Sequence, residues 1–263
     1  MNPDNSAQKS EGLSSLLNAG AEIAGGVAGA AVGLLAAGPP GALAGGASGP
    51  LITMALKRLG AEVSQRLLAP REQKRIGATL AFAVNRIKER LDQNDKLRDD
   101  GFFDRRLSSP STAEEVFEGV VLAAQREHEE RKLPFMGNLM ANLAFHPEID
   151  RGYANYLIKL AEGLSFRQLS LLLLFALRDK SSLRQTDYRS TQSFSLPLVG
   201  ILHEILELEQ KGLIASGEAT LGVTDIAPAR MNTQGAGSTL VQLMELQKLP
   251  LTDLRASSEL LKA

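Results

Sequence analysis

The chain has 263 residues, with 29 Lys and Arg against 30 Asp and Glu, 44% hydrophobic residues and no cysteine. This composition is typical of a globular protein of one or two domains, and the formal net charge of −1 disfavours a general binder of polyanions. The lack of cysteine excludes a disulfide framework, a thiolate metal site and a cysteine nucleophile.

The most unusual feature is an apolar run near the N-terminus. A polar leader, residues 1–18, is followed by 34 consecutive residues, 23–56, that carry no charged side chain and consist mostly of Ala, Gly, Leu and Val. The sequence Gly-Pro-Pro-Gly at 38–41 interrupts the run, because proline removes a backbone donor and glycine permits a tight reversal. The pattern predicts a helical hairpin over residues 19–56.

Both arms of this hairpin carry glycine at every fourth position. On a helix this spacing places the glycines on one face, where another helix can approach closely, and such glycine zippers are typical of helix packing in membranes. We therefore expect the hairpin to insert into a bilayer or to self-associate. The zipper glycines are Gly25, Gly29 and Gly33 in the first arm and Gly41, Gly45 and Gly49 in the second.

A basic stretch follows the hairpin. Residues 57–90 contain nine Lys and Arg against three Glu, and basic flanks suit an anionic cytoplasmic leaflet. Lys57, Arg58 and Arg66 are the first of these cations and are expected to face lipid. Residues 91–130 are acidic, with eleven acids against five bases. The two stretches either pair with each other or form solvated helix faces, and we favour solvated faces because exposed ion pairs contribute little.

Three other interpretations of the apolar run remain open. A secretory signal fits poorly, because the run is long and rich in glycine. A flexible tail is compatible with small side chains that bury little area. The run also suits a soluble hairpin that packs on its own domain or in an oligomer core.

Residues 57–179 predict a bundle of about five helices. Apolar residues recur there at steps of three and four, and two capping boxes mark helix starts, at Ser111 with Glu114 and at Ser165 with Gln168. Leu169 to Leu177 is apolar on nearly every face, so we expect it at the centre of the bundle. The other expected helices span 70–94, 111–131, 135–145 and 153–160.

The C-terminal third follows a polar linker or loop at 180–197. Residues 198–208 have helical apolar spacing, and Gly212 suits the position just after a helix end. Alternation at 219–226 predicts a strand, and 238–246 predicts a closing helix. Together with the string LELEQKGLI at 206–214, these features resemble a winged-helix domain over 198–263.

The winged-helix resemblance implies a recognition helix that exposes His203, Glu207 and Lys211. Two further carboxylates on the same helix, Glu204 and Glu209, would repel phosphates, so a protein partner is favoured and nucleic acid is disfavoured.

Two further strings, PFMGNLMANL at 134–143 and LSFRQL at 164–169, are similar to a helical block of uncharacterised bacterial proteins that join a small-residue or membrane segment to a helical domain. The resemblance implies a role in phage defence or stress and names no activity.

A search for catalytic motifs finds none. The three histidines, His128, His146 and His203, are scattered, and the chain has no HExxH, P-loop or GxSxG motif. Residues 92–101 contain several acidic residues, as a calcium-binding loop does, but they lack the glutamate that closes such a loop. We therefore expect that the protein is not an enzyme and that it uses no cofactor, no metal and no small-molecule substrate.

These observations predict a mainly α fold with a glycine-zipper hairpin, a helical bundle and a winged-helix-like α/β domain. The function expected from them is that of a non-enzymatic, self-associating, membrane-active effector, cytoplasmic and associated with the inner membrane. The alternative is a soluble adaptor or regulator that binds a protein through its winged helix.

Overall fold

The computed structural model describes residues 48–105, 109–178, 182–217 and 220–262. Within these ranges the chain is mainly helical, as expected, with nine α-helices and one two-stranded sheet. It divides into two compact units, Met1–Gly163 and Leu164–Ala263. Each unit has its own core.

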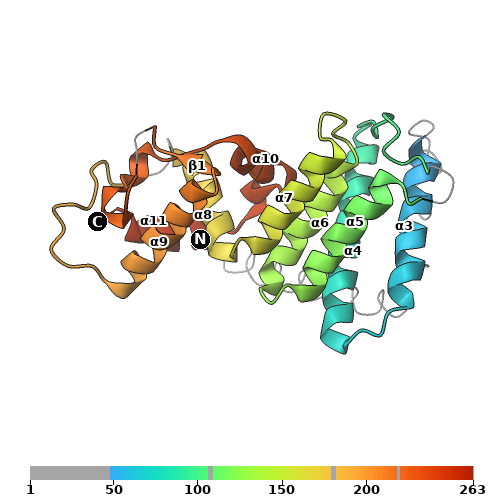
Figure 1. The fold of residues 1–263 in the computed structure, drawn as a ribbon, viewed down its shortest axis with the longest axis horizontal. Helices are drawn as coiled ribbons and strands as arrows, with labels where there is room; N and C mark the ends of the chain where they lie inside the picture. Colours follow the sequence, from blue (N-terminus) through green and yellow to red (C-terminus); the bar gives the residue numbers. More distant parts are fainter. Residues whose placement is uncertain (1–47, 106–108, 179–181, 218–219, 263) are drawn as a thin grey trace, which may run out of the picture. The chain divides into compact units, whose positions relative to one another are not determined.

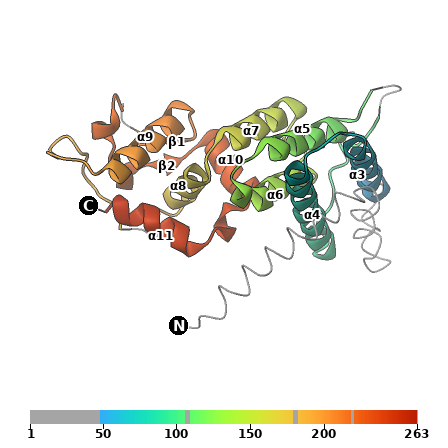
Figure 2. The same cartoon turned by 90° about the horizontal axis from the view of Figure 1, so that it is seen from below.

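The first unit is a helical bundle, and α3 forms its outer edge in both views (Figures 1 and 2). Four of its helices match those expected between residues 70 and 160 to within a few residues at each end. The expected capping box at Ser111 is also present, with the Glu114 N–H donating to Ser111 Oγ at 3.2 Å. The elements are α3 (Ser48–Ser64), α4 (Pro70–Asp92), α5 (Thr112–Arg126), the 3₁₀ turn η1 (Glu130–Lys132), α6 (Leu133–Leu143) and α7 (Arg151–Gly163).

The helices α4 and α6 pack closely against each other. A Cβ added to Gly137 on α6 would lie 2.6 Å from Phe82 Cβ and 2.8 Å from the Thr79 carbonyl oxygen, both on α4. Only glycine permits this separation, and it lets the helices bury large side chains on either side, such as Ile87 and Leu139.

The second unit surrounds a buried central helix. The helix is α8 (Phe166–Ala176), which packs against α9, α10 and α11. Its N-terminus has the expected capping box, with the Gln168 N–H donating to Ser165 Oγ at 3.1 Å. The other elements are α9 (Leu196–Gln210), β1 (Ile214–Ala215), η3 (Val223–Asp225), η4 (Pro228–Arg230), β2 (Asn232–Thr233), α10 (Gly235–Leu243), η5 (Leu246–Lys248) and α11 (Leu251–Leu260).

Two boundaries differ from those expected. The sequence pattern assigns α8 to the bundle of residues 57–179, but the helix lies in the second unit, because its buried face meets the C-terminal helices. The expected linker also contributes to the core of that unit, since Leu183 and Tyr188 are 5% and 1% exposed. The Tyr188 N–H donates to the Thr224 carbonyl at 2.8 Å, which joins this segment to the rest of the unit.

The elements expected in the C-terminal third occur only in part. The helix α9 ends before Gly212, whose φ of +69° suits a residue just after a helix, and β1 follows. The strand predicted at 219–226 is wrong for its described residues, 220–226, where a loop and the 3₁₀ turn η3 occur instead. The strand that pairs with β1 is β2, antiparallel, with Ile214 opposite Thr233. A winged-helix fold stays a prediction.

Candidate functional site

The glycine zipper lies mostly outside the described residues. Gly25, Gly29, Gly33, Gly41 and Gly45 all belong to that part of the chain. Gly49 is buried in the first turn of α3, where its carbonyl accepts a hydrogen bond from Thr53 Oγ1 at 3.1 Å. Of the helices that the structure describes, none combines the length and apolar character needed to cross a bilayer.

The last nine residues of the apolar run, 48–56, lie in a helix that also carries charged residues. The expected boundary between residues 56 and 57 falls in the middle of α3, which joins the last nine apolar residues to the first basic ones. Pro50 is tolerated because it lies in the first turn, where backbone N–H groups have no helical partner. Ile52, Leu56 and Leu59 are buried, and α3 packs against α5.

Arg58 on α3 and Arg66, two residues after this helix, pair with acids of α5. Arg58 Nη1 lies 3.0 Å from Glu114 Oε1, and Arg66 Nη2 lies 2.5 Å from Glu118 Oε1. Lys57 is exposed. Glu114 also accepts a bond from Arg105 Nε at 3.0 Å. Hence the basic and acidic stretches pair within the molecule at α3 and α5, and the expectation of merely solvated faces does not hold there.

One carboxylate, that of Glu114, therefore joins three segments. Burial by itself raises the pKa of Glu114, but hydrogen bonds from the Ser111 N–H and from the Arg105 and Arg58 side chains outweigh it, so the pKa is lowered overall. The carboxylate stays ionised at neutral pH and holds α3 against the N-terminus of α5.

The three residues expected on a recognition helix share one face of α9. His203, Glu207 and Lys211 follow each other at steps of four, and all are at least partly exposed. The Lys211 ammonium pairs with the Glu207 carboxylate, which lowers the pKa of Glu207, and Gln168 Nε2 donates to the same carboxylate at 2.9 Å. Nearby, Arg167 makes two bonds to Glu204, at 2.7 and 2.8 Å. This face therefore presents balanced charges, which fit a protein surface better than a polyanion.

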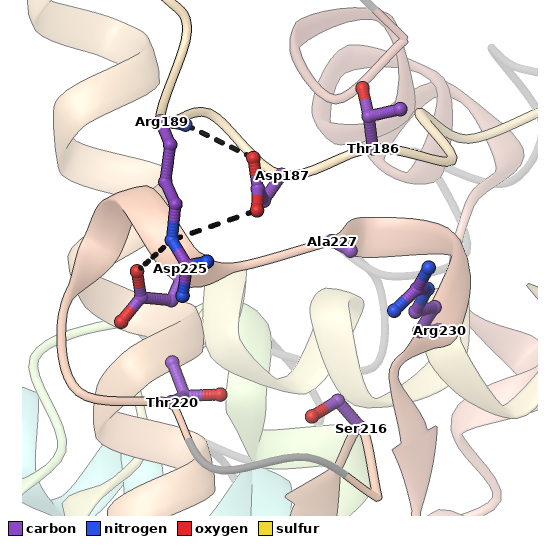
Figure 3. Close-up of a pocket in the computed structure, with 8 residues that line it drawn as sticks. All are labelled: Thr186, Asp187, Arg189, Ser216, Thr220, Asp225, Ala227 and Arg230. Atoms are coloured by element: carbon purple, nitrogen blue, oxygen red, sulfur yellow. Dashed lines mark hydrogen bonds and ion pairs between the residues drawn. The ribbon is translucent and has the colours of Figure 1, made fainter.

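A polar pocket in the second unit was missed by the sequence analysis (Figure 3). It has a volume of about 240 Å³ and is formed by the segment before α9 and by the connection between β1 and β2. Irregular segments have no periodicity, so no sequence pattern marks such a site. Its lining residues are Thr186, Asp187, Arg189, Ser216, Thr220, Asp225, Ala227 and Arg230.

Asp225 supports the wall of this pocket. Its Oδ2 accepts the backbone N–H groups of Leu221 and Gly222 at 3.0 and 3.1 Å, and its Oδ1 lies 2.9 Å from Arg189 Nε. The Arg189 bond is the largest cause of the lowered pKa of Asp225, and the two backbone bonds lower it further. Asp225 is thus a fixed anion that orients Arg189.

Among the described residues no group of three or more His, Asp or Glu side chains is placed to hold a metal ion. The histidines are apart: His146 Nδ1 lies 2.5 Å from Glu148 Oε1, while His128 and His203 are exposed on other segments. That the chain uses no metal or cofactor and is not an enzyme stays a prediction.

Comparison of the chain with protein-family models, with curated proteins and with solved structures finds no match.

Proposed function

We propose that this protein is a non-enzymatic, self-associating, membrane-active effector of the bacterial cytoplasm that acts at the inner membrane. One observation carries the proposal: a charge-free run of 34 residues leads directly into α3, a helix packed on the first bundle. The last nine residues of the run, 48–56, belong to α3 itself, and Ile52 and Leu56 are buried there, so the bundle holds this end of the run.

The attachment through α3 gives the bundle control over the apolar run. A displacement of α3 on the bundle would move the end of the run that this helix contains. The Arg58–Glu114 pair on α3 and the Arg66–Glu118 pair just after it hold α3 on α5, so the bundle fixes where the apolar run ends. In the proposed mechanism the glycine zippers then associate with each other in or on the bilayer. A role in phage defence is implied by the resemblance of residues 134–143 and 164–169.

The test uses the full chain and anionic liposomes loaded with a fluorescent dye. Gly29→Leu with Gly45→Leu fills the zipper face, and we expect it to lower dye release and the size of the assemblies by about tenfold. The matched control, Ala31→Leu with Ala47→Leu, adds the same bulk on the opposite helix face, because a shift of two residues turns a helix by about 200°. Equal behaviour of both variants would contradict the zipper mechanism.

A second candidate function is that of a soluble adaptor, favoured by the balanced charges on α9. In that case His203, Glu207 and Lys211 contact a protein partner. Crosslinking in cells from a photoreactive residue at position 203, compared with one at the exposed Lys159 on α7, tests this candidate. A crosslinked protein obtained at 203 alone supports the adaptor, and identical patterns at both positions argue against it.

A further inference from the structure

The helix α3 belongs both to the expected hairpin and to the first bundle. The second arm of the hairpin, residues 41–56, ends with nine residues that lie in α3. Ile52 and Leu56 follow Gly49, the last glycine of the zipper, by three and seven positions, so all three share one helix face. Each of them is buried, and α3 packs against α5. The face through which this arm would associate with another helix is therefore already covered in the structure.

The nine residues in α3 make up more than half of the second arm. A helix rises about 1.5 Å per residue, so residues 41–47 alone would span about 10 Å, while the first arm, residues 19–37, would span about 28 Å. With residues 48–56 the second arm would reach about 24 Å. The two arms can therefore pack along their length only if residues 48–56 leave the bundle.

Two ion pairs hold the charged end of α3 at the edge of the bundle (Figures 1 and 2). The side chains of Arg58 and Glu118, one from each pair, are 41% and 35% exposed, so water and ions reach both pairs. Glu114 also accepts hydrogen bonds from the Ser111 N–H at 2.8 Å and from Arg105 Nε at 3.0 Å. Loss of Arg58 therefore leaves no buried charge without a partner. The arginines can exchange their carboxylates for other anions.

The link between α3 and α4 permits α3 to move. It consists of residues 65–69, which belong to neither helix, and Leu67 within it is fully exposed. Arg66 also pairs with Glu62, at 2.9 Å and one turn earlier, and this second pair can move together with α3. Leu67 thus provides a hinge at which α3 can turn away from α5 while α4 stays in place.

We propose that the structure is a resting form and that anionic lipid releases α3 from α5. The lipid phosphates become the partners of Arg58 and Arg66, in place of the α5 carboxylates, and residues 48–56 leave the bundle. Exposed ion pairs contribute little in water, and the attraction of arginine to an anionic leaflet is of comparable size, so the exchange is balanced. The apolar face of α3 passes from the bundle to the lipid interface. This inference rests on the proposed membrane function and names what regulates it.

The experiment uses a crosslink that locks α3 on α5. The chain has no cysteine, so Arg66→Cys with Glu118→Cys provides two thiols at a paired position, and a bis-maleimide with a reducible spacer joins them. We expect the crosslink to lower dye release from anionic liposomes by at least about tenfold, and reduction of the spacer to restore it. The matched control, Arg71→Cys with Glu130→Cys, joins α4 to η1 across a pair of 2.9 Å and leaves α3 unlocked, so its crosslink should not change dye release.

The same thiols report whether α3 leaves α5. Anionic liposomes added before the bis-maleimide should lower the yield of the crosslink between positions 66 and 118 by at least about fivefold. Neutral phosphatidylcholine liposomes and inorganic phosphate should leave this yield unchanged, because release also requires a lipid interface that accepts the apolar face of α3. The control crosslink between positions 71 and 130 should form equally under all these conditions.

The outcomes separate this inference from the function on which it rests. A locked protein that releases dye as well as the unlocked one would overturn the release of α3 and leave the membrane function standing. An unchanged crosslink yield on anionic liposomes that bind the protein, or an equal loss of yield with inorganic phosphate, would overturn the lipid trigger. If neither the locked nor the unlocked protein floats with anionic liposomes, the proposed function is wrong and this inference is wrong with it.

Discussion

Arg58 on α3 and Glu114 on α5 form an ion pair of 3.0 Å that joins the start of the basic stretch to the middle of the acidic one. The Glu114 side chain is only 9% exposed, whereas that of Arg58 is 41% exposed, so the carboxylate is the member whose loss matters more. Glu114 also accepts from Arg105 and from the Ser111 N–H, and it thereby holds α3, the 101–105 segment and the start of α5 together.

The first prediction concerns this carboxylate. Glu114→Gln keeps an acceptor for the Ser111 N–H but removes the charge that attracts Arg58 and Arg105. We expect the free energy of unfolding, measured in urea, to fall by about 1 kcal/mol. Glu259→Gln, which breaks an exposed pair with Lys262, should change it by less than about 0.5 kcal/mol. Equal effects of the two substitutions would mean that Glu114 does not hold α3 in place.

The pH dependence of stability follows from the lowered pKa of Glu114. Because the folded carboxyl binds a proton less readily than the unfolded one, the unfolded state takes up more protons on acidification. The stabilisation is fully present above the ordinary pKa of 4.5 and is lost as the pH falls below it. Urea denaturation from about pH 7 to about pH 3.5 should therefore show a smaller loss of stability in Glu114→Gln than in the parent. The same slope in both proteins would contradict the assignment.

The third prediction concerns the contact between α4 and α6. Gly137→Ala would place a Cβ 2.6 Å from Phe82 Cβ and 2.8 Å from the Thr79 carbonyl oxygen, so the two helices must separate. We expect a loss of about 3 kcal/mol in the free energy of unfolding. Gly163→Ala, at the end of α7, meets nothing within 4 Å and should be neutral or slightly stabilising. A neutral Gly137→Ala would show that the helices do not approach as closely as described.

A buried ion pair gives the fourth prediction. Lys132 and Glu127 pair with side chains 2% and 5% exposed, and Lys132 Nζ also donates to the Glu162 carbonyl at 3.1 Å. Lys132→Met leaves Glu127 charged and buried, which should cost about 3 to 5 kcal/mol of stability in urea denaturation. The exposed Lys159 provides the matched control, since Lys159→Met should change stability by less than about 0.5 kcal/mol. Similar losses in both variants would argue that the pair is not buried.

Local signals predict the helices well. The capping boxes at Ser111 and Ser165 lie where the sequence indicates, because the chemistry of a helix start involves residues only three positions apart. The expected end of the apolar hairpin at residue 56 does not mark the end of a helix, because the change from apolar to charged residues occurs within one helix, α3.

Features that depend on distant contacts are not predictable in this way. The assignment of α8 to the second unit depends on helices that follow much later in the chain, and Tyr188 is buried by segments on both sides of it in sequence. The pocket combines residues from 186 to 230 that belong to irregular segments. The ion pairs that Arg58 and Arg66 make with α5 join residues more than fifty positions apart, and the segregation of charge between the two stretches is the sequence feature that indicates them.

The central claim is that the N-terminal apolar run drives membrane association or assembly. A deletion that ends before Ser48, and so leaves α3 whole, tests this claim most directly. A chain beginning at Lys57 would cut α3 and remove the buried Ile52 and Leu56, whereas a chain beginning at Ser48 keeps the whole helix. Both the full chain and the chain from Ser48 should be floated with anionic liposomes and sized by light scattering. We predict that the full chain floats or forms large assemblies and that the shortened chain remains a small particle in the dense fractions. If both proteins stay in the dense fractions with similar sizes, the apolar run is not the effector.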